Sequence, residues 1–108
     1  MILRHLFAIA VLPFTVTVLV PAWRNGRVIA LFGSTIHHTD VGGYGIGAGG
    51  RDCFEEGLWI PICKLMRGGG RDDDKGGQRN EDVWKFILSN VRQPDHMAGD
   101  LHAQMASG

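Results

Sequence analysis

The chain has 108 residues, enough for one small domain, and a domain of this size buries only about 60–65% of the surface that its unfolded chain exposes. Eleven Lys and Arg residues balance eleven Asp and Glu residues, which excludes the basic excess that a non-specific nucleic-acid binder needs. Two cysteines are too few for a disulfide scaffold, and 16 glycines, about twice the usual share of roughly 7%, indicate long loops.

The first apolar segment, residues 6–20, carries no charged residue and fits three interpretations. It could be a signal peptide, because small residues follow Val20. It could associate with a membrane, although a spanning helix needs roughly 20 residues and Pro13 would interrupt it. It could also contain a buried strand, because residues 15–20 are rich in β-branched side chains.

A tight turn is expected at Asn25 and Gly26, since both residue types tolerate a positive φ. Strand-like runs lie on both sides of this dipeptide. The sequence therefore predicts an antiparallel hairpin formed by residues 15–23 and 27–34, with Pro21 at an edge or a bulge.

Glycine-rich and irregular segments follow the hairpin. Residues 41–50 include six glycines, and their match to the dinucleotide-binding spacing indicates a loop because no strand–helix–strand unit surrounds it. Residues 54–65 are apolar, contain Pro61 and are expected to pack as extended chain. Residues 67–78 are charged and glycine-rich, which predicts a solvated loop.

Two amphipathic helices are predicted at the C-terminus. Asn80 is a suitable N-cap for a helix over residues 81–91, and Pro94 with Asp95 begins a second helix that runs to Ala106. The apolar stripes comprise Val83, Trp84, Ile87, Leu88 and Val91 in the first helix and Met97, Leu101 and Met105 in the second. The expected fold class is α+β: an N-terminal β-hairpin, glycine-rich loops and two C-terminal amphipathic helices.

His37, His38 and Asp40 are the candidate site residues. Two imidazoles and a carboxylate are common ligands of first-row metals, and they stand where a strand enters a glycine loop. On an extended chain His38 and Asp40 point to one side and His37 to the other. A single ion would therefore need a bend in the strand and ligands from elsewhere, and polar residues that simply satisfy a strand end are an equally weighted alternative.

Three motifs together resemble the hydantoinase B/oxoprolinase family. They are GRVIALFGSTIHHTDVGG (residues 26–43), FEEGLWIPICKL (residues 54–65) and EDVWKFILSNVRQPDHMAGDLHAQ (residues 81–104). The resemblance implies a cytoplasmic, ATP-dependent hydrolase of cyclic amides, of the N-methylhydantoinase or 5-oxoprolinase type. It also implies a hydantoinase A-type partner subunit or domain.

The same resemblance implies an incomplete protein. Family members run to several hundred residues, so residues 15–108 would form part of a larger domain, inactive alone, behind an apolar segment at residues 1–14. His37 matches a histidine that binds a divalent metal (Mn or Zn) in the acetone-carboxylase branch. The other ligand positions fall on Leu12 and Thr15, which supply neither imidazole nor carboxylate.

A second, more limited resemblance concerns the N-terminus. Residues 3–23 are similar to the first membrane segment of isoprenylcysteine methyltransferase-type proteins. The alternative function is therefore a small membrane-anchored or protein-interaction protein, with residues 6–20 as the anchor and the C-terminal helices as a docking surface.

Overall fold

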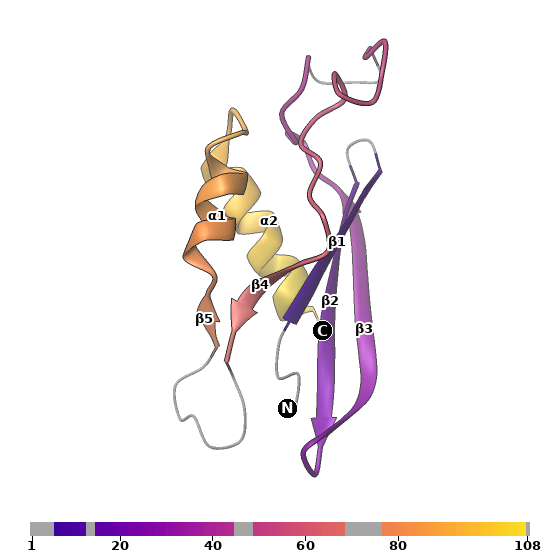
Figure 1. Cartoon of the computed structure of the whole chain (residues 1–108), viewed down its shortest axis with the longest axis vertical. Coiled ribbons are helices and arrows are strands. Elements are labelled where there is room, and N and C mark those ends of the chain that lie inside the picture. The colour runs from indigo at the N-terminus through magenta and orange to yellow at the C-terminus, as the bar shows by residue number, and fades with distance from the viewer. Residues whose placement is uncertain (1–5, 13–14, 45–48, 69–76, 108) are drawn as a thin grey trace.

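The computed structural model describes residues 6–12, 15–44, 49–68 and 77–107. Along the chain, the elements are β1 (Leu6–Leu12), β2 (Thr15–Arg24), β3 (Arg27–His37), β4 (Cys63–Arg67), β5 (Gln78–Arg79), α1 (Glu81–Leu88) and α2 (Pro94–Ala106). The strands form one antiparallel sheet in the order β3-β2-β1-β4-β5, and both helices lie beside it (Figure 1). The predicted α+β class is confirmed.

The long β2–β3 hairpin turns where the sequence predicts. Asn25 and Gly26 have φ values of 50° and 75°, and two positive φ angles are typical of the turn that matches the twist of a hairpin. The strand pairing runs from the turn to the pair Thr15 and His37, so β3 is longer than expected. Pro21 lies beyond Leu19, the last residue of β2 that pairs with β1, and therefore removes no donor from that ladder.

The apolar N-terminal segment contributes strands to the sheet. β1 pairs with β2 on one side and with β4 on the other, so residues 6–12 are part of the same sheet as the hairpin. The strand interpretation of residues 15–20 is confirmed by β2. The described residues contain no helix with the length and hydropathy required to cross a bilayer.

The middle of the chain agrees with the sequence only in part. The described residues between positions 41 and 62 are irregular, as expected, whereas β4 begins at Cys63 inside the segment predicted as extended chain. The short strand β5 was not predicted, and it includes Gln78 from the expected solvated loop. Most of that loop, and part of the glycine-rich match at residues 45–50, lies outside the described residues.

The two helices are separate, as predicted, although α1 ends at Leu88 rather than at residue 91. Asn80 is the N-cap residue of α1, as predicted, but its side chain makes no capping hydrogen bond. Its Nδ2 donates instead to the backbone oxygen of Lys64 at 3.0 Å, and its backbone N–H donates to that of Leu65 at 2.8 Å. Asn80 therefore attaches the start of α1 to β4.

The core lies between the helices and one face of the sheet, with α2 between α1 and the β2–β3 hairpin (Figure 1). Its buried apolar residues are Val16, Val18, Val41, Ile60, Leu65, Trp84, Ile87, Met97 and Leu101. The molecule is elongated, with extents of 48 × 23 × 22 Å, because the hairpin reaches past the end of α2. The core therefore supports only the proximal half of the hairpin.

Candidate functional site

The three predicted site residues lie in different surroundings. His37, at the end of β3, is exposed, and its Nδ1 lies 3.2 Å from the hydroxyl oxygen of Thr15. His38 and Asp40 are buried, with exposed fractions of 3% and 7%, and both face α2 and the turn before it. This is the alternation that an extended chain produces, and it separates His37 from the other two.

His38 is held by a buried hydrogen-bond network with Gln104. The side-chain Nε2 of Gln104 donates to the backbone oxygens of Val16 and Ser34, both at 2.9 Å. Its Oε1 therefore faces Nε2 of His38, also at 2.9 Å, and accepts a hydrogen bond from the N–H at that nitrogen. One glutamine thus connects the last turns of α2 with β2, β3 and His38.

The second ring nitrogen of His38 also faces α2. Nδ1 lies 2.9 Å from the sulfur of Met97 and 3.8 Å from a carboxylate oxygen of Asp100. Both ring nitrogens are therefore occupied by contacts with one helix. His38 attaches the end of β3 to α2.

Asp40 holds the turn that leads into α2. Its Oδ1 accepts from the N–H of Gly42 at 2.9 Å, and its Oδ2 accepts from the N–H groups of Gln93, at 2.8 Å, and Arg92. Nη1 of Arg92 forms an ion pair with Oδ1 at 3.3 Å. Burial would raise the pKa of Asp40, but these backbone donors and the guanidinium together lower it below its ordinary value.

The glycines after Asp40 allow close packing of backbone on backbone. Gly42 and Gly43 have φ values of 79° and 82°. A Cβ at Gly42 would lie 2.5 Å from the backbone oxygen of Asn90, and one at Gly43 would lie 2.5 Å from that of Glu55. Any side chain here would collide with two other parts of the chain.

These contacts bring the three sequence motifs together. The N–H of Leu58 donates to the oxygen of Val41, and the N–H of Tyr44 donates to that of Glu55, both at 2.7 Å. We call residues 40–44, 55–58 and 90–93 the motif junction. Residues from all three motifs therefore form a single packed unit around Asp40.

The loop beside the motif junction is stabilised locally. The carboxylate of Glu55 accepts from the backbone and the guanidinium of Arg51, with the shortest contact at 2.8 Å. These hydrogen bonds lower the pKa of Glu55. Oδ1 of Asp52 accepts from the N–H of Phe54 at 2.9 Å, and the indole N–H of Trp59 donates to the oxygen of Cys53 at 2.7 Å. Polar contacts within the loop thus leave Phe54, with an exposed fraction of 83%, facing solvent.

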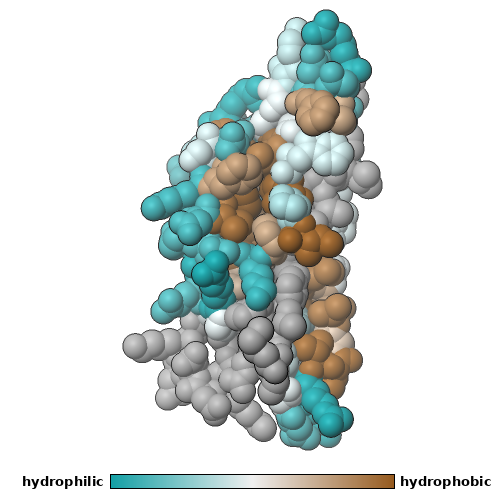
Figure 2. All heavy atoms as spheres, in the orientation of Figure 1, coloured by the Kyte–Doolittle hydropathy of each residue, from teal (hydrophilic) through white to brown (hydrophobic). Residues whose placement is uncertain are grey.

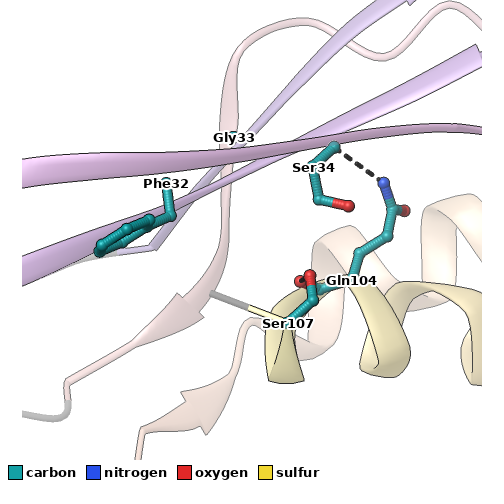
Figure 3. Close-up of a pocket in the computed structure, with 5 residues that line it drawn as sticks. All are labelled: Phe32, Gly33, Ser34, Gln104 and Ser107. Carbon is teal, nitrogen blue, oxygen red and sulfur yellow. Dashed lines mark hydrogen bonds between the residues drawn. The ribbon is translucent and has the colours of Figure 1, made fainter.

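A small pocket lies away from the motif junction, between β3 and the last turn of α2 (Figure 3). Its volume is about 110 Å³, and it is lined by Phe32, Gly33, Ser34, Gln104 and Ser107. Ligand sites are typically about 300–1,000 Å³, so this pocket has the size for a side chain rather than for a cofactor.

The metal-ligand positions implied by the family resemblance lie side by side in the sheet. Leu12 of β1 pairs with Thr15 of β2, which pairs with His37 of β3. The donor set at these positions is one imidazole and one hydroxyl, which does not fit a divalent transition metal. Within the described ranges, no group of three or more His, Cys, Asp and Glu side chains could hold a metal ion.

Two residues that organise the site, Gln104 and Arg92, carry no recognised functional motif in the sequence. Gln104 follows Met97 and Leu101 at helical spacing, so a polar residue in a buried stripe was the available signal. Arg92 gave no such signal, because its role depends on a turn that approaches Asp40 from 52 residues away.

Several known proteins are similar in sequence to this chain over most of its length. An uncharacterized protein of Methanocaldococcus jannaschii is 37% identical over 95 residues, covering 85% of this chain and 16% of that protein. Caprolactamase subunit beta of Pseudomonas jessenii is 33% identical over 87 residues, covering 78% of this chain and 14% of that protein. A 5-oxoprolinase of Pestalotiopsis fici is 35% identical over 95 residues, covering 84% of this chain and 7% of that protein.

No solved structure gave a significant match. The chain spans only 7% to 16% of the length of these relatives. The family model described as hydantoinase B/oxoprolinase matches residues 13–108, which include all three motifs and the complete motif junction. On this match, the chain belongs to the hydantoinase B/oxoprolinase family.

Proposed function

We propose that this chain is a part of a cyclic-amide hydrolase of the hydantoinase or oxoprolinase type. The reaction adds water to the ring amide and breaks its C–N bond, which yields a carboxylate and an amine. The observation that carries the proposal is the motif junction, where the three family motifs pack on one another around Asp40.

The chain contributes structure and does not catalyse the reaction alone. His38 and Asp40 are engaged in holding α2, which leaves His37 as the accessible member of the predicted set. The rest of the site would come from regions that correspond to the parts of the relatives outside the matched segment, which covers only 16% and 14% of two of them. One relative is named as a subunit beta, which supports the presence of a companion subunit. We expect that companion to be a hydantoinase A-type subunit and the reaction to use ATP.

The chain as it stands does not hold manganese or zinc at His37. The neighbouring positions, Leu12 and Thr15, offer no imidazole or carboxylate, and transition-metal sites need several such ligands converging on the ion. The variant with both Leu12→His and Thr15→Asp places three ligands across adjacent strands. It should bind Zn²⁺ more tightly than the parent chain in isothermal titration calorimetry.

A chimera tests the function directly. Residues 26–108 replace the matching segment of caprolactamase subunit beta, which keeps its own preceding segment, and the product is assembled with its natural companion subunit. We expect hydrolysis of the caprolactamase substrate by the chimera and none by the 108-residue chain. The His37→Ala chimera should assemble and lose activity. A chimera that assembles and is inactive contradicts the proposal.

A further inference from the structure

The tip of the β2–β3 hairpin has little support from the core. The large apolar side chains of β3 on this half of the hairpin are exposed: Val28 at 44%, Ile29 at 62%, Leu31 at 59% and Phe32 at 51%. Figure 2 shows this apolar flank and the hydrophilic tip beyond it. Segments with few buried apolar contacts open at a smaller free-energy cost than the core does.

The pairing at the tip weakens this end of the hairpin further. Arg24 pairs with Arg27 across the two-residue turn, so two like charges stand opposite each other, which is destabilising. Neither guanidinium forms an ion pair with a residue that the structure describes. The register of the two strands also shifts between Ala22 and Trp23. We therefore expect the tip to open while the rest of the sheet stays paired.

The two turn residues, Asn25 and Gly26, form the only Asn-Gly step in the sequence. In an open chain the backbone nitrogen of Gly26 can attack Cγ of Asn25, because glycine has no side chain to shield it. The N–Cγ bond forms, the Cγ–Nδ2 bond breaks, and the amide proton of Gly26 leaves with Nδ2 as ammonia. Water then opens the succinimide ring and leaves either an aspartate or an isoaspartate at position 25.

The closed turn prevents this attack. The φ values of 50° and 75° in a two-residue loop define a type I′ turn, in which ψ of the first central residue is about +30°. This ψ places the nitrogen of Gly26 nearly opposite Cβ of Asn25 about the Cα–C bond, whereas ring closure requires the two atoms to be eclipsed. We propose that Asn25 is a site of spontaneous deamidation that reacts only when the hairpin tip opens.

The two products have different effects on the hairpin. An aspartate keeps the backbone, fits the same turn type, and brings a carboxylate close to the two opposed arginines. An isoaspartate adds one methylene group to the backbone, which does not fit a two-residue loop between paired residues. Opening of the tip therefore leaves a permanent covalent mark, and the isoaspartate product does not close again.

The other two asparagines are internal controls. Asn80 is 7% exposed and is followed by Glu81, and Asn90 is followed by the β-branched Val91. The side chain of the following residue shields the attacking nitrogen in both cases. We expect these two amides to persist while Asn25 is converted.

Mass spectrometry of the full chain, incubated at neutral pH and then digested with chymotrypsin, measures the conversion in the fragment of residues 24–31. Deamidation should be at least about tenfold slower in the folded chain than in the chain unfolded by urea, which corresponds to an opening free energy of about 1.4 kcal/mol. The slowing should be smaller than the equilibrium constant for global unfolding, because the tip opens alone. Equal rates in the two states, or no deamidation in urea, overturn the proposal, as does a slowing that equals the global constant.

A charge reversal at the tip provides the second test. Arg27→Glu places opposite charges across the turn, so it should increase the ratio of the unfolded-state rate to the folded-state rate. Lys85→Glu on α1 is the matched control, because Lys85 is also exposed and lies on a helix, and its ratio should equal that of the wild type. Each variant in urea supplies its own reference rate. An unchanged ratio in Arg27→Glu, or an equal increase in both variants, shows that opening of the tip does not control the reaction.

Discussion

Replacing Asp40 by Asn should loosen the attachment of α2 to the sheet. The carboxylate accepts from three backbone N–H groups, through two different oxygens, and an amide keeps only one of these oxygens. At least one buried N–H then faces an NH₂ group. Hydrogen bonds to a charged group contribute about 1.5–3 kcal/mol, and neutral ones about half of that, so we expect a loss of roughly 2–4 kcal/mol. Domains of this kind have only about 5–15 kcal/mol of stability.

The same carboxylate should make the stability depend on pH. The pKa of Asp40 in the folded chain is below its ordinary value, which is about 3.9 in an unfolded chain. The unfolded chain therefore binds the proton more tightly. The contribution of the Asp40 carboxylate to the free energy of unfolding is complete above about pH 5. It is lost as the pH falls through the folded-state pKa of Asp40. Asp40→Asn should remove this part of the acid destabilisation.

Urea unfolding followed by circular dichroism, at pH 7 and at several acidic pH values, measures both effects. Asp95→Asn is the matched control, because Asp95 is exposed and lies in the first turn of the same helix. The Asp95→Asn variant should lose only about 0.3–1 kcal/mol of stability, the usual effect of a charge at a helix end. If Asp40→Asn costs no more than this control, or unfolds in acid like the wild type, Asp40 does not hold α2 as described.

Three further substitutions or titrations test other parts of the structure. Gly43→Ala should lower the free energy of unfolding in urea by about 1–3 kcal/mol, because its Cβ would lie 2.5 Å from a backbone oxygen. Gly99→Ala is the control and should be neutral or stabilising, because the space around Gly99 is open. Gln104→Met should cost about 1–3 kcal/mol, because it leaves the buried Nε2–H of His38 without an acceptor; a smaller loss would argue against the network. Calorimetry with manganese or zinc should detect no sub-micromolar complex, and a 1:1 complex that His37→Ala abolishes would contradict the proposal.

The elements with strong local signals were predictable from the sequence. The hairpin follows from a turn dipeptide between two β-branched runs, and Pro94 marks the start of α2 because proline is favoured in the first turn of a helix. β4 and β5 carry little pattern of their own. β4 forms because β1 offers it an edge to pair with, and β5 forms because β4 in turn offers one. Neither segment contains a pattern that predicts these contacts.

The site was predictable in its residues but not in their roles. His38 and Asp40 stand out in any scan for metal ligands, yet apart from Gly42 the partners that define their roles lie 52 to 66 residues further along the chain. A carboxylate and an imidazole look the same in a sequence whether they face an ion or a helix terminus. The position of α2 decides whether these side chains face an ion or a helix. That position depends on the packing of Met97 and Leu101 in the core.

The bond from Gln104 to Val16 joins residues 88 positions apart. A chain is synthesised from its N-terminus at about 5–20 residues per second, so β2 and β3 exist for several seconds before the glutamine that bridges them. During this interval the N–H of His38 lacks its final acceptor, and the apolar edge of β3 is exposed beside an incomplete core. A chaperone that recognises apolar strands would find its target here until Gln104 closes the network.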